Sequence, residues 1–206
     1  MIDAASLQGM EQFYQEVAVL GRIRHPHIVQ LLGVCRDRGC LVYEMMDNGT
    51  LEDHLASKRI KSRPLKWVER LRIATDVSSA LLFLHKARPH PILHRDIKPA
   101  NILLDHSLSA KLGDVGLSKL VPELSTQSTV RTTAPIGTYA YMDPAYLTEG
   151  IVGSFTDVYA LGITFLQLLI WMDEPVGIRK VVLDALEKDT LGETIDETIK
   201  GQSLSV

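Results

Sequence analysis

The stretch His94-Arg95-Asp96-Ile97-Lys98-Pro99-Ala100-Asn101 decides the fold of this 206-residue chain. It gathers a carboxylate, an amine and an amide in one short loop that follows a predicted helix. In such a loop Asp96 can accept a proton, Lys98 can place a positive charge beside an anionic group, and Asn101 can offer its side-chain oxygen to a hard cation. A plain polar loop is the weaker interpretation, because a second motif lies at the right distance downstream.

The second motif is Gly113-Asp114-Val115-Gly116. Two short apolar runs before it, residues 102–104 and 110–112, predict an antiparallel hairpin. This hairpin brings Asn101, just before its first strand, and Asp114, just after its second, to the same end. Amide and carboxylate oxygens are ligands for a hard cation. The two motifs together therefore predict a shared ion site, whereas an isolated Asp-x-Gly sequence is more often a simple turn.

The N-terminal part of the chain predicts a helix followed by a hairpin. Residues 11–24 carry apolar side chains at helical spacing, and Glu16 falls inside the apolar stripe, where a carboxylate requires a partner. Residues 28–35 and 40–44 predict the two strands of the hairpin. The only two cysteines could face each other across it, lack metal-site spacing, and in a cytosolic setting are expected to stay reduced.

Three further helices are predicted in the remainder of the chain. Thr50 and Asp53 resemble a capping box at the start of a short helix. Residues 67–86 predict a long helix, whose stripe consists of Leu71, Ala74, Ser78, Leu81 and His85. The apolar run Val158–Met172 is interrupted by Gln167 and is shorter than the roughly 20 residues of a membrane-spanning helix. It therefore predicts a buried helix.

Composition and charge exclude several classes of protein. The chain is 46% hydrophobic and can bury a sizeable core. Its net charge of -3 and pI near 6.2 give no overall attraction to nucleic acid. The sequence contains no secretion-type pattern and no membrane-spanning run. We therefore expect a cytoplasmic globular protein with no nucleic-acid partner and no membrane span.

The motifs resemble those of eukaryotic protein kinase domains, with Ile97 and Val115 at positions where that family commonly has Leu and Phe. More narrowly, the chain resembles plant receptor-like cytoplasmic kinases, in particular the kinase domain of the subset fused to a ubiquitin-ligating U-box. The segments that carry the narrower resemblance are Ser6-Leu7-Gln8-Gly9, Arg24-His25-Pro26-His27, Gly39-Cys40-Leu41-Val42-Tyr43-Glu44, Gly113-Asp114-Val115-Gly116-Leu117 and Gly137-Thr138-Tyr139-Ala140-Tyr141-Met142-Asp143-Pro144.

This resemblance implies an α+β, protein-kinase-like fold with two lobes. We expect residues 1–46 to be a remnant of the small lobe with the hinge, reduced to a regulatory helix and a short hairpin. Residues 47–172 are expected to form a mostly helical large lobe that lacks its late helices. Residues 173–206 are expected to form a divergent C-terminal tail.

The resemblance also implies a role for each motif residue, with ATP and Mg²⁺ as cofactors. The implied residues are Asp96, Lys98 and Asn101 for catalysis, Asn101 and Asp114 for the metal, and Glu44, Met46, Leu103 and Asp114 for the nucleotide. Asp96 would act as the base. The Glu44 carbonyl and the Met46 amide would meet adenine, and Leu103 would lie under its ring.

Further positions match regulatory features of the family. Glu16 lies in the regulatory helix, and Arg95 suggests a dock for a phosphate on a Ser or Thr between Ser125 and Thr133. Thr138 together with Lys98 matches the Ser/Thr kinase pattern rather than that of Tyr kinases. The residues implied for the regulatory spine are Leu20, Leu31, His94 and Val115, with Asp157 as their anchor and Tyr43 as gatekeeper.

Parts of the family pattern are missing from the sequence. No G-x-G-x-x-G loop occurs, and no Lys or Arg precedes Arg22, so Glu16 has no upstream cation. The A-P-E position reads Asp143-Pro144-Ala145, without the usual glutamate. We therefore expect a truncated kinase that is inactive as this chain alone.

Three functions remain open from the sequence. The first is a protein Ser/Thr kinase that acts on a protein substrate, with a possible ubiquitin-ligase module in the parent protein. The second is a non-catalytic, kinase-like interaction module, which the missing lysine favours. The third is a metal-dependent hydrolase built on Asp96, Asn101 and Asp114. It ranks far below the others because no nucleophile-generating His or second carboxylate is predicted nearby.

Overall fold

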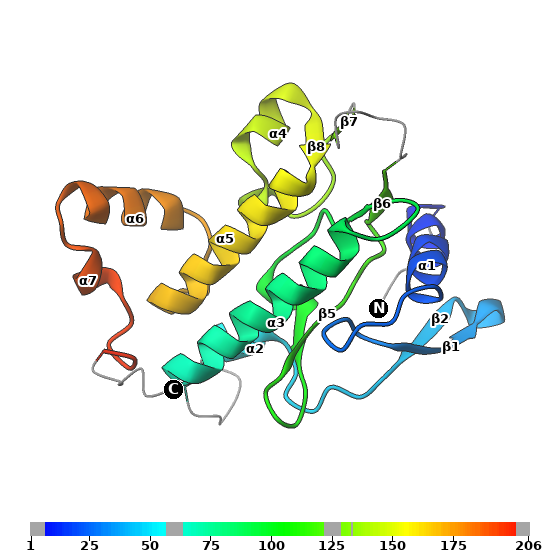
Figure 1. Ribbon diagram of the computed structural model, residues 1–206, viewed down its shortest axis with the longest axis horizontal. Helices are drawn as coiled ribbons and strands as arrows, with labels where there is room; N and C mark the ends of the chain where they lie inside the picture. The colour runs from blue at the N-terminus through cyan, green and yellow to red at the C-terminus, as the bar shows by residue number, and fades with distance from the viewer. Residues whose placement is uncertain (1–6, 57–63, 122–128, 133, 201–206) are drawn as a thin grey trace.

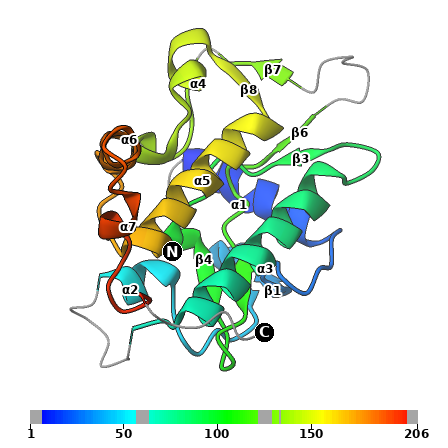
Figure 2. The ribbon, with the colours of Figure 1, turned by 60° about the vertical axis from the view of Figure 1, so that its left-hand side comes forward.

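The computed structural model of this protein describes residues 7–56, 64–121, 129–132 and 134–200. Two long helices, α3 (Trp67–His85) and α5 (Ser154–Ile170), lie side by side at the centre of the molecule (Figure 1). Figure 2 shows the same pair from another side, with the N-terminal helix α1 (Leu7–Leu20) behind them. The central pair supports the loops that carry the motif residues.

The other elements are short, and all sheets described are two-stranded and antiparallel. The strand pairs are β1 (Leu31–Cys35) with β2 (Cys40–Tyr43), β3 (Ile92–Leu93) with β6 (Lys119–Leu120), β4 (Ile102–Leu104) with β5 (Ala110–Leu112), and β7 (Thr129–Arg131) with β8 (Ile151–Gly153). The remaining helices are α2 (Leu51–Leu55), α4 (Pro144–Glu149), α6 (Ile178–Glu187) and α7 (Leu191–Thr194). No helix in the described ranges is long and apolar enough to cross a membrane.

Both predicted hairpins are present. The β4–β5 hairpin has the predicted strand limits, and its first pair joins Ile102 to Leu112. The backbone N–H of Gly113 donates to the carbonyl of Asn101 at 2.9 Å. The ladder therefore brings the residues that flank the hairpin to one end, as expected. The capping box of Thr50 and Asp53 is also present at the start of α2.

The buried face of α3 differs from the predicted stripe. Leu71 and Ser78 are exposed, whereas the apolar core side of the helix consists of Ile73, Val77, Ala80, Leu81 and Leu84. Arg70 and Asp76 are buried on the same side, each with hydrogen-bond partners. The predicted stripe therefore shares only Leu81 with the buried side, and it misses the apolar residues Ile73, Val77, Ala80 and Leu84.

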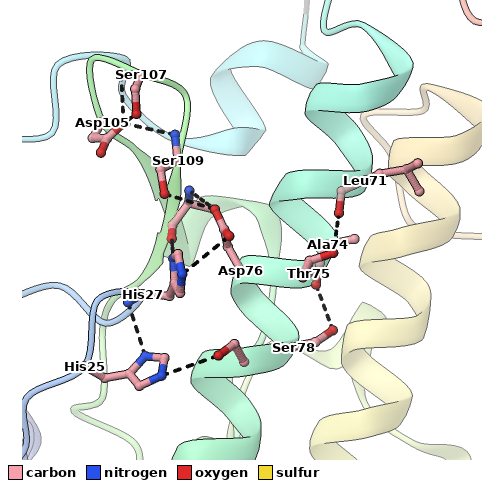
Figure 3. A network of polar contacts seen from close by, with 12 residues as sticks. His25, His27, Leu71, Ala74, Thr75, Asp76, Ser78, Asp105, Ser107 and Ser109 are labelled. Carbon is pink, nitrogen blue, oxygen red and sulfur yellow. Dashed lines mark hydrogen bonds and ion pairs between the residues drawn. The ribbon is translucent and has the colours of Figure 1, made fainter. Parts of the chain in front are cut away.

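Asp76 joins the segment after α1 to the centre of the molecule (Figure 3). Its Oδ2 accepts hydrogen bonds from Ser109 Oγ at 3.0 Å and from the backbone N–H of Ala110 at 2.9 Å. Its Oδ1 lies 3.5 Å from His27 Nε2, while His27 Nδ1 lies 3.1 Å from the Ala110 carbonyl oxygen. The ring of His25 stacks on Phe83 of α3, with the ring centroids 4.9 Å apart. These contacts fix the N-terminal hairpin against α3 and β5.

A buried arginine attaches the C-terminal segment to the same helices. Arg70 is 2% exposed, and its guanidinium donates to the Leu168 carbonyl at 2.7 Å and lies 4.1 Å from the ring centre of Trp171. It also forms an ion pair with Asp196 and donates to Thr198 Oγ1 at 3.0 Å. In the described part of residues 173–206, α6 and α7 are the only helices, and α6 packs against α5.

Replacing Asp196 with Ala removes the carboxylate that balances the buried charge of Arg70. We expect the free energy of unfolding to fall by about 3 kcal/mol, because breaking a buried ion pair from one side leaves an uncompensated charge. Urea unfolding of the two proteins measures the difference. In the matched control, Glu197→Ala, the side chain is 91% exposed and pairs with Lys200 at 3.5 Å, so a change below about 0.5 kcal/mol is expected. Equal losses in both variants would contradict the role of Asp196.

Candidate active site

One buried carboxylate of α5 holds the catalytic-loop motif in place. Asp157 is 1% exposed and accepts hydrogen bonds from the backbone N–H groups of His94 and Arg95, at 2.9 and 2.8 Å. Its Oδ2 also lies 2.8 Å from His85 Nε2 at the end of α3. These bonds hold Arg95 at a φ of 67°, a left-handed conformation that a residue with a side chain rarely adopts. The ring of His94 in turn contacts the Gly113 carbonyl at 3.0 Å.

The next residue, Asp96, receives hydrogen bonds on both carboxylate oxygens. Oδ1 accepts from the backbone N–H and the hydroxyl of Thr138, at 2.9 and 2.7 Å. Oδ2 lies 2.9 Å from Lys98 Nζ and accepts from Asn101 Nδ2 at 3.0 Å. Burial raises the pKa of Asp96, but the contacts with Lys98, Thr138 and Asn101 outweigh it and lower the pKa below its ordinary value. The carboxylate is therefore ionised at neutral pH and can accept a proton.

Lys98 and Thr138, which the sequence pairs through a family pattern, are brought together. Lys98 Nζ donates to Thr138 Oγ1 at 2.8 Å, and the same hydroxyl donates to Asp96. The three side chains thus form a closed set of contacts. It links the catalytic loop to the segment before α4, which lies 40 residues downstream of Lys98.

The donor set around Asn101 and Asp114 fits a magnesium ion. The amide nitrogen of Asn101 is engaged by Asp96, so its side-chain oxygen is the atom that remains to ligate a cation. Asp114 is exposed, with a φ of 54°. The described residues contain no group of three or more His, Cys, Asp or Glu side chains that could hold a metal. Mg²⁺ suits such a sparse site because it binds one or two carboxylates together with water and substrate phosphates.

Gly113 lies close to Leu103 and to the backbone of Asn101. A Cβ on Gly113 would lie 2.8 Å from Leu103 Cδ1, the flexible end of that side chain, which would have to shift. Gly113 is buried between Asn101 and Leu103, the residue implied for the adenine ring.

Residues 48–50, which follow the residues implied for adenine, run beside β4. The backbone N–H of Leu104 donates to the Gly49 carbonyl at 2.9 Å, so the segment after β2 runs beside Leu103. The side chain of Glu44 is engaged elsewhere, because it accepts from the Gln30 N–H at 2.8 Å and pairs with Lys111 at 2.6 Å. The Glu44 side chain is therefore already paired within the protein. The contact of adenine with the backbone groups of Glu44 and Met46 stays a prediction.

Glu16 has a partner that the sequence did not suggest. The carboxyl group is 2% exposed and hydrogen-bonds the hydroxyl of Tyr43, the implied gatekeeper. Burial, with a smaller contribution from the charge of Asp114, raises the pKa of Glu16 to about 7, against the opposing effect of the hydrogen bonds to Tyr43 and to the backbone of Val115. The residues implied for the spine, Leu20, Leu31, His94 and Val115, are all buried.

Arg95 is partly buried, and one of its guanidinium N–H groups is bound to the backbone. Its Nε donates to the Leu117 carbonyl at 2.6 Å, and burial lowers the pKa of its guanidinium. Of the implied partners between Ser125 and Thr133, residues 125–128 and 133 lie outside the described residues. The phosphate dock at Arg95 therefore stays a prediction.

The segment around Ala145 begins helix α4. The side chain of Asp143 accepts a hydrogen bond from the Ala145 N–H at 2.8 Å and caps α4, with Pro144 in its first turn. The hydroxyl of Tyr146 on this helix accepts from the Ile136 N–H at 3.0 Å. Asp143 thus starts the helix, and Tyr146 attaches the preceding segment to it. Sequence reasoning missed both contacts, although an Asp before a Pro is a recognisable capping signal.

Because the pKa of Glu16 is raised in the folded protein, we expect the free energy of unfolding to depend on pH. We expect Glu16→Gln to remove this dependence. A carboxyl whose folded-state pKa is about 7, against about 4.3 when unfolded, contributes stability below pH 4 that is lost as the pH rises through 7. Relative to the parent, Glu16→Gln should therefore gain roughly 2–3 kcal/mol in free energy of unfolding between pH 5 and pH 8. Urea unfolding at both pH values measures the gain. Glu11→Gln, an exposed change on the same helix, is the control; an equal gain there would contradict this assignment.

Comparison with known proteins places the chain in a family. The family model described as "Protein kinase domain" matches residues 2–184. The chain is 49% identical over 191 residues to U-box domain-containing protein 52 of Arabidopsis thaliana, an alignment that covers 92% of the chain and 22% of that relative. It is also 49% identical over 196 residues to U-box domain-containing protein 70 of Oryza sativa subsp. japonica, with 94% and 24% covered.

A third relative carries the family activity in its name. Wall-associated receptor kinase 3 of Arabidopsis thaliana is 40% identical over 205 residues, covering 95% of this chain and 27% of the relative. The chain spans about a quarter of the length of these three relatives. The predicted resemblance to plant U-box kinases and the mixed α+β kinase fold are confirmed. The chain belongs to the protein kinase domain family.

Proposed function

We propose that this chain carries the phosphoryl-transfer site of a protein serine/threonine kinase, which moves the γ-phosphate of ATP to a protein hydroxyl. The observation that carries the proposal is the closed set of contacts among Asp96, Lys98 and Thr138. A carboxylate held ionised in this way can accept a proton from a hydroxyl that lies against it. Oδ1 of Asp96 already accepts a bond from an aliphatic hydroxyl, the group that a Ser or Thr substrate presents.

Each residue has a distinct part in this mechanism. Asp96 orients the substrate hydroxyl and takes its proton, Lys98 places a positive charge beside the transferred group, and Thr138 fixes the direction of the carboxylate. Asn101 and Asp114 would hold magnesium, which supplies charge neutralisation for phosphate oxygens when bound. The backbone of Glu44 and Met46, with Leu103, would hold the adenine ring of ATP.

The proposal also covers the parent protein, its cellular location and its division into domains. Two of the relatives compared are named for a U-box domain, which supports a parent protein that joins this domain to a ubiquitin-ligase module. A cytoplasmic location is part of this proposal. The division into a small-lobe remnant, a large lobe and a divergent tail also belongs to the proposal.

A chimera tests the role of Asp96 with the rest of a kinase domain present. Residues 7–200 replace the matching segment of wall-associated receptor kinase 3, and phosphate transfer from ATP to a Ser/Thr peptide is measured beside the unaltered relative. We expect transfer by the chimera and a loss of roughly 100-fold or more on Asp96→Asn, because a positioned base contributes about 10²–10⁴-fold. Asp37→Asn, a change in an exposed turn, should leave the rate unchanged. A folded chimera that binds ATP without transfer would favour a non-catalytic module, and transfer untouched by Asp96→Asn would overturn the assignment.

The 206-residue chain by itself should transfer negligible phosphate. Catalysis in this family depends on positioning and charge stabilisation of the β- and γ-phosphates, and the sequence contains no Gly-rich loop and no lysine upstream of Glu16. In an assay with ATP, Mg²⁺ and a generic Ser/Thr substrate, incorporation should equal that of Asp96→Asn. Incorporation that disappears with Asp96→Asn would show that the chain is active without these parts.

A further inference from the structure

The two cysteines of the chain lie directly opposite each other in the β1–β2 hairpin. Cys35 ends β1, Cys40 begins β2, and the two are partners in the strand register. Both side chains are exposed, and both are free thiols. Neither belongs to the proposed catalytic site, which lies around Asp96.

The strand register provides the spacing that a disulfide requires. Directly opposed residues of an antiparallel pair have Cα atoms about 4.5–5.5 Å apart and side chains on the same face. Disulfides form between Cα atoms about 4.4–6.8 Å apart. The turn between the two residues is closed by a hydrogen bond from the Gly39 N–H to the Arg36 carbonyl at 3.2 Å, with Gly39 at a φ of 59°. The thiols are therefore held in register before any bond forms.

The turn also offers charge to an anionic partner. Arg36 and Arg38 are exposed on either side of the single acid Asp37, so the turn carries a net positive charge. Glutathione disulfide is a small, carboxylate-bearing oxidant, and opposite charge raises its local concentration near the turn. Disulfides inside cells are usually transient and redox-sensing rather than structural, which suits an exposed pair of this kind.

We propose that Cys35 and Cys40 form a thiol modification site, which glutathione disulfide converts into an intramolecular disulfide. One thiolate attacks a sulfur of glutathione disulfide, the S–S bond breaks, and one glutathione leaves. The opposed thiolate then attacks the protein-side sulfur of the mixed disulfide, the Cys35–Cys40 bond forms, and the second glutathione leaves. Two electrons pass from the protein to glutathione disulfide, and the two protons lost by the cysteines end on the two glutathione thiols.

The second step is fast because it is intramolecular. A group held in position reacts at a far higher effective concentration than one that arrives from solution. The mixed disulfide is therefore short-lived in the parent chain. It persists only where the opposed thiol is absent or points to the other face of the hairpin.

The test incubates the protein with oxidised and reduced glutathione at a series of ratios, quenches with acid and measures mass. The parent chain should lose two hydrogens and carry no glutathione. Trypsin, which cleaves after arginine, should then cut within the turn and leave the peptides bearing Cys35 and Cys40 joined until a reductant is added. Cys35→Ser should stop at one glutathione adduct on Cys40.

A variant whose two thiols lie on opposite faces of the hairpin tests whether the strand register is required, or whether two nearby thiols are enough. Val34 opposes Leu41 and points to the opposite face from Cys40. The double variant Val34→Cys, Cys35→Ser keeps two thiols near the same turn, and we expect it to take two glutathione adducts without closing. The proposal is overturned if the parent accumulates two adducts, forms intermolecular dimers, or stays unmodified at a ratio that modifies Cys35→Ser. It is also overturned if the displaced pair closes as readily as the parent.

Discussion

The carboxylate of Asp157 accepts two consecutive backbone N–H groups, those of His94 and Arg95, and contacts the ring of His85. The buried charge is therefore compensated by three contacts, without which its burial would be strongly unfavourable. One side chain of α5 thereby fixes both the end of α3 and the start of the catalytic loop. The left-handed backbone of Arg95 persists because these bonds over-determine it. The geometry of Asp96 follows from this anchor.

Two further constraints bring the remaining groups to Asp96. The β4–β5 register and the close approach at Gly113 place Asp114 at the end of the hairpin where Asn101 begins it. The loop before α4 delivers Thr138 to both the carboxylate and Lys98. Each contact joins segments that are distant in sequence, so the site exists only when the central helices, the hairpin and that loop are all in place. Within the site, Asp96 and Asn101 are buried, Lys98 and Thr138 are partly exposed, and Asp114 is exposed.

The local features of this fold could be predicted from the sequence, whereas its long-range polar pairs could not. The strands 102–104 and 110–112 and the capping box at Thr50 depend on neighbouring residues, and the structure matches them. The predicted stripe of α3 shared only Leu81 with its buried side, and the contact of buried Arg70 with Asp196, a partner 126 residues away, had no sequence signal. Hydrophobic periodicity carries no information on such pairs. The motif spacing indicated candidate site residues, but not the hydrogen bonds that lower the pKa of Asp96.

Glu16 shows how a long-range polar pair changes the charge state expected of a motif residue. The family pattern pairs this glutamate with a lysine, and a cation would favour its ionised form. Here its partner is the neutral Tyr43 hydroxyl, and the carboxyl titrates near pH 7. The charge of Asp114 contributes to the raised pKa, so a cation bound at Asp114 would also favour the ionised form of Glu16. The protonation of this buried carboxyl is thereby coupled to the charge near Asp114.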